Sequence, residues 1–209
     1  MTLPTGVERH DFGDVSGLAT VGETVSDEAT DGRWRYWDPH RSKLGATLEL
    51  DVQTGLHAGD SVLYLGAAAG TTVSHVADFA GPTYAVEFAP RPVRDLVDVA
   101  ASRDRLFPLL KDARRPETYA HVVESGLDAI VQDVATRGQA RVAVENRRFL
   151  SDDGVLIAAI KARSEDVTAE PSTVFDRVLD DLADAYHVRT TTRLEPYHDD
   201  HLAVVADPS

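Results

Sequence analysis

Three lysines stand out in this sequence because the chain otherwise uses arginine for positive charge. Of its 21 basic residues, only Lys43, Lys111 and Lys161 are lysines, and the others are arginines. Lysine can release and take up a proton in a folded protein, whereas arginine stays protonated. A lysine that is kept against this bias is therefore a candidate for chemistry that arginine cannot perform.

Lys43, Asp133 and Lys161 stand at the ends of apolar segments. A lysine beside a second cation gives up its proton more readily and can then serve as a base. An aspartate between two lysines would hold them in place and balance their charge. The alternative for Lys161 is a strand-end lysine that only extends its ammonium into solvent. The scarcity of lysine favours the functional interpretation.

From residue 60 onward, the sequence alternates between expected strands and expected helices. The strands cover 61–65, 83–88, 106–110, 128–132 and 155–161, and the helices 70–79, 92–101, 118–123, 140–150 and 172–185. Two last strands, 186–194 and 201–206, are too close for a helical crossover and must form an antiparallel hairpin. The pattern predicts an α/β protein with a mostly parallel seven-stranded sheet covered by helices on both faces. Five β/α units and a C-terminal hairpin are typical of the Rossmann-like methyltransferase fold.

The start of the chain has a different character. Residues 1–40 are rich in Gly, Asp and Thr and contain short alternating runs at 7–10 and 33–37, which indicate β-hairpins. We therefore expect a small N-terminal β appendage over 1–40 and the main domain over 41–209. A short helix is expected at 44–52.

Ligands of an open parallel sheet bind beyond the carboxyl ends of the strands. Here those ends carry, in chain order, the glycine turn 66–72, Glu87, Asp112, Asp133 and Lys161. The glycine turn lets a ligand approach the backbone, and the helix that follows favours an anionic group at its N-terminus. Glu87 stands where an acid binds the ribose hydroxyls of a nucleoside cofactor, with a cap of the next helix as the alternative. Asp112 is expected beside the adenine.

Several stretches in order along the chain resemble the fibrillarin family, the 2′-O-methyltransferases of box C/D RNA-guided complexes. They are 41–44, 62–72, 84–88, 111–114, 132–135, 161–164 and 194–197, followed by Asp200 and His201. The resemblance implies S-adenosylmethionine as the cofactor and a catalytic group of Lys43, Asp133, Lys161 and His201. With the glycine turn, the cofactor-binding residues are then Gly66, Ala67, Gly70, Thr71, Thr72, Glu87, Phe88, Asp112, Ala113, Asp133, Val134, Ala135 and Thr136. Two positions depart from the family pattern. Thr136 replaces a common Gln, and His198 replaces an acid, so we expect His198 to be a solvated turn residue.

The resemblance implies methylation of ribose 2′-hydroxyls in rRNA, with tRNA as a further substrate. Lys161 would activate the hydroxyl, Asp133 would position Lys161, and His201 would orient the ribose or the lysine. The chain lacks the basic stripe and the aromatic motif of an RNA-reading protein. Target choice would therefore depend on box C/D guide RNA, a Nop-family scaffold protein and a kink-turn-binding ribosomal-type protein. The alternatives are a stand-alone RNA or small-molecule methyltransferase and a catalytically silent partner-binding subunit.

Composition excludes several other classes of protein. The chain has no cysteine, which rules out disulfides, thiolate zinc sites and thiol catalysis. Its histidines do not cluster at metal-ligand spacing, so no metal is expected. No apolar run is long enough to span a bilayer, and the first residues do not read as a signal peptide. We expect a cytoplasmic protein without a membrane partner.

The balance of acidic and basic residues indicates the salt concentration to which the protein is adapted. The chain has 35 acidic and 21 basic residues, for a formal net charge of −14. High acidity with little lysine is typical of a protein from a halophilic archaeon, with an ordinary acidic cytosolic protein as the alternative.

We predict that folding needs molar salt, because dilute buffer leaves the acidic surface repelling itself. The thermal midpoint should rise strongly between dilute buffer and molar potassium chloride. A midpoint that stays flat over this range would refute the halophilic interpretation.

Overall fold

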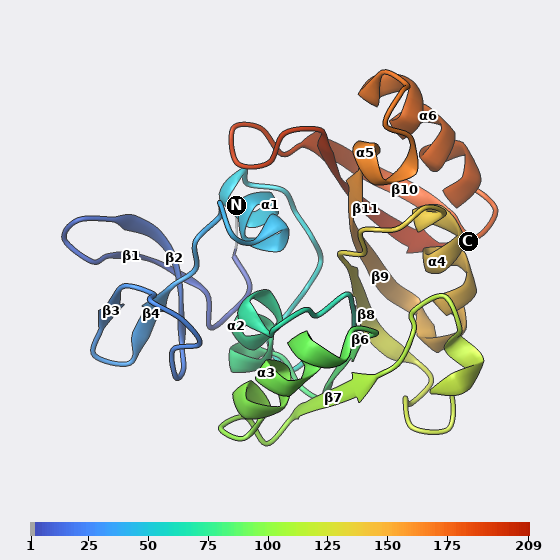
Figure 1. Ribbon diagram of the computed structural model, residues 1–209. Helices are drawn as coiled ribbons and strands as arrows, with labels where there is room; N and C mark the ends of the chain where they lie inside the picture. Colours follow the sequence, from blue (N-terminus) through green and yellow to red (C-terminus); the bar gives the residue numbers. More distant parts are fainter. Residues whose placement is uncertain (1–2) are drawn as a thin grey trace.

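The computed structural model describes residues 3–209, which form two sheets (Figure 1). The larger sheet has seven strands in the order β10-β11-β9-β8-β5-β6-β7. Their bounds are β5 Val62–Leu65, β6 Thr83–Glu87, β7 Leu106–Leu110, β8 Leu127–Gln132, β9 Leu150–Lys161, β10 Tyr186–Arg193 and β11 His201–Pro208. Strands β5 to β9 pair in parallel, whereas β11 runs antiparallel to both β9 and β10. This arrangement confirms the predicted methyltransferase-type sheet with its closing hairpin.

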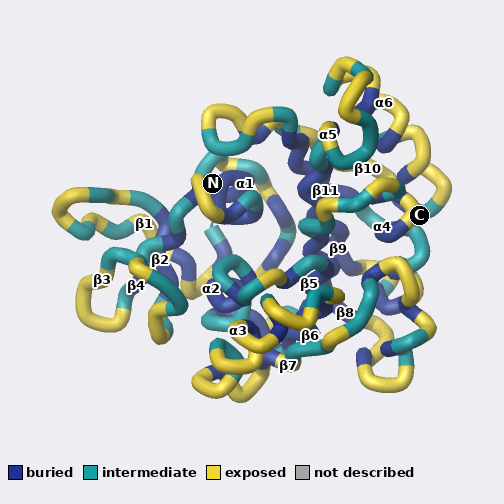
Figure 2. Tube along the Cα trace, viewed as in Figure 1, coloured by how far each residue is buried: buried dark blue, intermediate teal, exposed yellow. Residues whose placement is uncertain are grey.

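Helices cover both faces of the large sheet. Their bounds are α1 Lys43–Glu49, α2 Thr71–Phe79, α3 Pro90–Ala100, α4 Gln139–Asn146, α5 Ala162–Glu165 and α6 Pro171–Leu182. Strand β5 shows how the core is divided. Val62 and Tyr64 join the apolar cluster under α1, α2 and α3, whereas Leu63 and Leu65 join the cluster under α4 and α6. Figure 2 shows the sheet strands largely buried between these layers.

Several expected element boundaries differ from those of the structure. The helix expected over 140–150 ends at Asn146, a 3₁₀ turn follows at Arg147–Phe149, and β9 already begins at Leu150. The strand was expected only from Val155 because Ser-Asp-Asp-Gly at 151–154 has the composition of a turn. In the structure this segment is an irregularity within β9, where the register against β8 shifts between Leu127 and Ala129. The helix expected at 118–123 is instead a single 3₁₀ turn, Pro116–Thr118.

The N-terminal residues form a four-stranded antiparallel sheet in the order β1-β2-β4-β3. The strands are β1 Glu8–Asp11, β2 Ser16–Val21, β3 Thr30–Asp31 and β4 Trp34–Tyr36. Both runs that predicted hairpins form strands, and both pair with β2. Val7, Leu18 and Trp37 belong to the same apolar cluster as α1 and α2. The small sheet thus packs on the layer that contains α1 and α2.

A buried cluster of charges joins the small sheet to α2. Arg35 of β4 is 0% exposed and donates to Asp78 at 2.9 Å, Glu28 at 3.1 Å and Ser74 at 2.9 Å. Asp78 also accepts from Arg103 at 3.1 Å. Every charge in the cluster is therefore compensated, which is what a buried ion pair requires to be tolerated.

None of the helices in residues 3–209 combines the length and the hydropathy that spanning a bilayer requires.

We predict that Arg35→Met destabilises the fold by about 3–5 kcal/mol, because it leaves Glu28 without its buried cation and weakens the compensation of Asp78. The measurement is urea unfolding at constant high salt. Arg33→Met is the matched control, since Arg33 is exposed one residue before β4. Equal unfolding free energies for the two variants would contradict the prediction.

Candidate active site

A pocket of about 370 Å³ opens beyond the carboxyl ends of the central strands. It is lined by residues from the ends of β5, β6, β7 and β8 and from α1 and α4. They are Lys43, Gly66, Ala68, Val86, Glu87, Phe88, Lys111, Asp112, Ala113, Arg114, Asp133, Val134, Ala135, Thr136 and Val142. The structure thus brings together nine of the residues expected to bind a cofactor.

Four expected cofactor residues do not line this pocket: Ala67, Gly70, Thr71 and Thr72. Ala67 is only 4% exposed and belongs to the apolar cluster beneath the turn. Thr71 and Thr72 form the start of α2. Arg114 also lines the pocket beside Asp112, although no chemical pattern in the sequence singles it out. Lys111, one of the chain's three lysines, lines the pocket too, at a position for which the sequence predicts no specific role.

The two glycines of the turn are required by contacts within the protein. Gly66 has φ of +87°, and a Cβ placed on it would lie 2.2 Å from the carbonyl oxygen of Asp133. Gly70 has φ of +99° and faces side chains of α3. Only glycine fits such positions. Gly66 therefore permits the ends of β5 and β8 to approach closely, and this approach places Asp133 at the pocket.

Glu87 satisfies the backbone around it and still faces the pocket. Its carboxylate is buried, with the residue 8% exposed, and accepts from Ala68 N–H at 3.1 Å and from Ala89 N–H at 2.8 Å. Ala89 is the cap residue of α3, and the first turn of this helix receives no side-chain cap bond, so Glu87 braces the loop before the helix and does not cap the helix itself. Each carboxylate oxygen can accept two hydrogen bonds. Glu87 can therefore also accept from two hydroxyls of a ligand.

Asp112 is held by its neighbour Arg114. The guanidinium donates to both carboxylate oxygens, from Nε at 3.0 Å and from Nη2 at 2.7 Å, and the backbone N–H of Arg114 donates to Oδ1 at 2.9 Å. These bonds from Arg114 lower the pKa of Asp112 below its ordinary value. Asp112 is therefore an oriented, ionised acceptor at the pocket wall. Phe88, which directly follows β6, is 68% exposed and presents an apolar ring at the pocket.

Lys43 and Asp133 form an ion pair at the pocket. Nζ of Lys43 lies 3.0 Å from Oδ2 of Asp133, and both side chains are largely buried. Lys43 begins α1, whose cap is Ser42. The Ser42 hydroxyl accepts from Gly45 N–H at 2.9 Å and from Nε1 of Trp37 at 2.8 Å. Trp37 therefore sets where the helix, and with it Lys43, begins.

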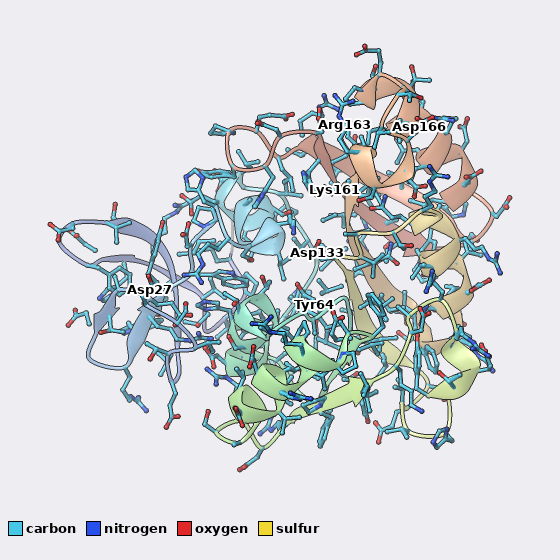
Figure 3. The ribbon with its side chains drawn as sticks, in the orientation of Figure 1. Asp27, Tyr64, Asp133, Lys161, Arg163 and Asp166 are labelled. Atoms are coloured by element: carbon cyan, nitrogen blue, oxygen red, sulfur yellow. The ribbon has the colours of Figure 1, made fainter. Side chains whose placement is uncertain are left out.

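Lys161 and His201 face each other across the β9–β11 ladder. They are direct register partners, and the neighbouring ladder bond runs from Ala162 N–H to the carbonyl of Asp200. Opposite residues of an antiparallel pair have Cβ atoms about 5 Å apart on one face. Figure 3 shows Lys161 and Asp133 at the edge where β9 and β8 end. In residues 3–209, the Lys161 ammonium has no hydrogen-bonding or ionic partner within hydrogen-bond distance, whereas Asp133 is paired with Lys43.

His201 is a neutral imidazole with one free acceptor. Its Nδ1 lies 2.7 Å from the carbonyl oxygen of Asp199, so Nδ1 carries the proton. Its Nε2 is buried and has no partner among the described residues. Burial lowers the pKa of His201, and the nearby charge of Lys43 acts in the same direction. Both effects favour the neutral form of the ring, in which the Nε2 lone pair is available.

The expectation for His198 is wrong. This residue is half-buried, its Nε2 lies 2.8 Å from the carbonyl of Pro39, and its ring centroid lies 5.6 Å from that of His201. Burial lowers its pKa. His198 thus ties the β10–β11 turn to the segment that leads into α1.

The chain resembles known proteins over almost its whole length. The fibrillarin family model matches residues 15–209. A fibrillarin-like rRNA/tRNA 2′-O-methyltransferase from Halobacterium salinarum is 71% identical over 209 residues, covering 100% of both chains. The chain belongs to the fibrillarin family.

Solved structures of fibrillarins share the fold over nearly the whole chain. Aeropyrum pernix fibrillarin, in complex with natively bound S-adenosyl-L-methionine, is 40% identical with a TM-score of 0.82, and the match covers 99% of this chain and 100% of that one. A fibrillarin/Nop5p complex contains a chain that is 36% identical with a TM-score of 0.91, covering 100% of both.

We predict that Glu87→Ala weakens binding of S-adenosylmethionine by roughly 1–3 kcal/mol, the cost of a lost hydrogen bond to a charged group. Isothermal titration calorimetry measures this, with circular dichroism to verify the fold. Glu117→Ala is the control, since Glu117 is exposed in the 3₁₀ turn outside the pocket. Equal affinities for the parent and the Glu87 variant would remove Glu87 from the cofactor site.

Proposed function

We propose that the chain transfers a methyl group from S-adenosylmethionine to ribose 2′-hydroxyls of rRNA and tRNA, at positions selected by a box C/D guide RNA. One observation carries the proposal. The Lys43–Asp133 ion pair lines the same pocket as Glu87 and Asp112, and the adjacent strand ends in Lys161. Nucleoside-binding acids and a lysine that can exchange a proton are thus presented at one edge of the sheet.

The side chains of the pocket fit S-adenosylmethionine. Buried Glu87 offers acceptors for the two ribose hydroxyls, and ionised Asp112 offers one for the exocyclic amine of adenine. Phe88 and Val134 supply apolar surface for the base. When bound, the cofactor supplies an electrophilic sulfonium methyl group.

The remaining task falls to residues of the chain, which must orient the ribose 2′-hydroxyl and remove its proton. Lys161 suits this role because its ammonium is not engaged by any residue in 3–209. Asp133 holds Lys43 and balances the positive charge at the edge of the sheet. His201 suits the orientation of the ribose or of Lys161, since its Nε2 is an unused buried acceptor.

Target choice requires partners, which we propose to be box C/D guide RNA, a Nop-family scaffold protein and a kink-turn-binding ribosomal-type protein. A net charge of −14 repels the RNA backbone, and salt weakens phosphate contacts further. A Nop-family scaffold is supported by the fibrillarin/Nop5p complex, whose fibrillarin matches the whole of this chain.

We predict that Lys161→Arg lowers single-turnover methyl transfer by roughly 10²–10⁴-fold, the loss expected on removing a general base, while cofactor affinity and fold are kept. Arginine preserves the charge but cannot accept the hydroxyl proton near neutral pH. The assay uses the complex assembled with guide RNA and scaffold protein.

Lys43→Arg is the matched comparison for this assay. A guanidinium can still pair with Asp133, so this variant should lose less activity than Lys161→Arg. An arginine at 161 with near-parental turnover would rule out proton transfer by Lys161 and leave it an electrostatic or structural role.

A further inference from the structure

The backbone of Lys161 is held on one side by a side chain. The side-chain carbonyl of Gln139 accepts from Lys161 N–H at 2.9 Å, and its side-chain amino group donates to the Lys161 carbonyl at 3.1 Å. Gln139 is the first residue of α4 and is 0% exposed. These two bonds engage both polar groups of the Lys161 backbone.

Gln139 takes the place of a missing strand residue. The β8–β9 ladder ends with the pair Gln132 and Ala158, because the chain leaves β8 at Asp133. Lys161 lies beyond this point, so its N–H and C=O toward β8 have no strand partner. The side-chain amide of Gln139 has the donor and acceptor of a peptide group, and it completes the ladder at this position.

Gln139 is itself fixed by three hydrogen bonds to two residues, Glu165 and Gln132. Its backbone N–H donates to Oε1 of Glu165 at 2.6 Å, and its side-chain amino group donates to the same oxygen at 3.1 Å. Its backbone carbonyl accepts from the side-chain amide of Gln132 at 2.9 Å. Glu165 ends α5, four residues after Lys161, and its Oε2 accepts from Gly138 N–H at 2.8 Å.

These bonds form a closed network around two site residues. Lys161 is hydrogen-bonded to Gln139, and Gln139 is hydrogen-bonded to Glu165, which is joined back to Lys161 by the chain of α5. Gln139 is also hydrogen-bonded to Gln132, the residue before Asp133. A buried uncharged amide is well tolerated when its hydrogen bonds are satisfied. The Gln139 amide meets this condition through its bonds to Lys161 and Glu165, whereas Oε1 of Gln132 is buried without a partner among residues 3–209.

We propose that Gln139 is a positioning residue for Lys161. It fixes the end of β9, so that the ammonium is held relative to Asp133 without using any atom of the Lys161 side chain. A catalytic group displaced by about 1 Å can lose roughly 10²-fold in rate. This inference rests on the proposed function for the catalytic role of Lys161, but its structural part can be measured separately.

The test is Gln139→Met, which keeps the size of the side chain and removes both bonds to Lys161. The control is Tyr186→Phe, which removes another buried hydrogen bond to α4, from the Tyr186 hydroxyl to the Ala143 carbonyl at 3.0 Å, but leaves both bonds to the Lys161 backbone in place. The whole chain contains three lysines, so selective ¹³Cε-lysine labelling gives three signals, and each is assigned by one lysine-to-arginine variant.

In Gln139→Met, the Lys161 signal should shift or broaden while those of Lys43 and Lys111 stay in place. In the assembled guide complex, kcat should fall by at least about 10-fold, with the KM for RNA and the cofactor affinity within about 2-fold of the parent. Tyr186→Phe should lower stability at most and leave the lysine spectrum and kcat unchanged. A folded Gln139→Met protein with the parental Lys161 signal and kcat would overturn the proposal.

Two further results separate the possible failures. Near-parental turnover of Lys161→Arg would refute the catalytic role, while the Lys161 signal in Gln139→Met would still decide whether Gln139 positions that residue. If Gln139→Met does not fold, Glu165→Gln weakens the support of Gln139 at constant size. That variant should shift the same lysine signal by a smaller amount, and an unchanged signal would count against the network.

Discussion

The site depends on the close approach of two neighbouring strand ends. Gly66 at the end of β5 meets the backbone carbonyl of Asp133 at the end of β8, at a distance that no side chain would permit. This contact places the Asp133 carboxylate where Lys43 reaches it from α1. The ion pair then joins a helix that precedes the sheet to the sheet's central edge. The pocket, α1 and the Lys43–Asp133 ion pair are thus assembled around Gly66.

Lys43 and Lys161 are held by indirect supports. Lys43 is placed by the cap of α1, which Trp37 secures through the hydroxyl of Ser42. Lys161 is placed by two bonds between its backbone and the side-chain amide of Gln139. In each case neutral, buried side chains hold the backbone of the lysine and make no bond to its ammonium group. Such support fixes the Cα position from which a long, flexible side chain extends, and this limits where its terminal group can lie.

The sequence predicted the sheet, its closing hairpin and the strand ends that form the pocket, because alternation and strand termini are local signals. It failed at 150–154, where turn-like residues sit inside β9. It also missed what depends on packing between distant segments. Gln139 and Lys161 are 22 residues apart and His198 and Pro39 are 159 apart, and no local pattern links either pair. The sequence predicts Gly66 as a site residue because a ligand could approach its backbone. In the structure, glycine is required there because the Asp133 carbonyl lies too close for any side chain.

The buried cluster around Arg35 has a consequence for how the protein responds to its solvent. Ions screen charges that face water, but they reach charges in the interior far less. Arg35 and Asp78 are sealed from solvent, with side-chain exposures of 0% and 3%. The attachment of the small sheet, and through Trp37 the start of α1, is therefore insulated from ionic strength. The acidic exterior can respond to the salinity of the medium while the attachment of the small sheet keeps its geometry.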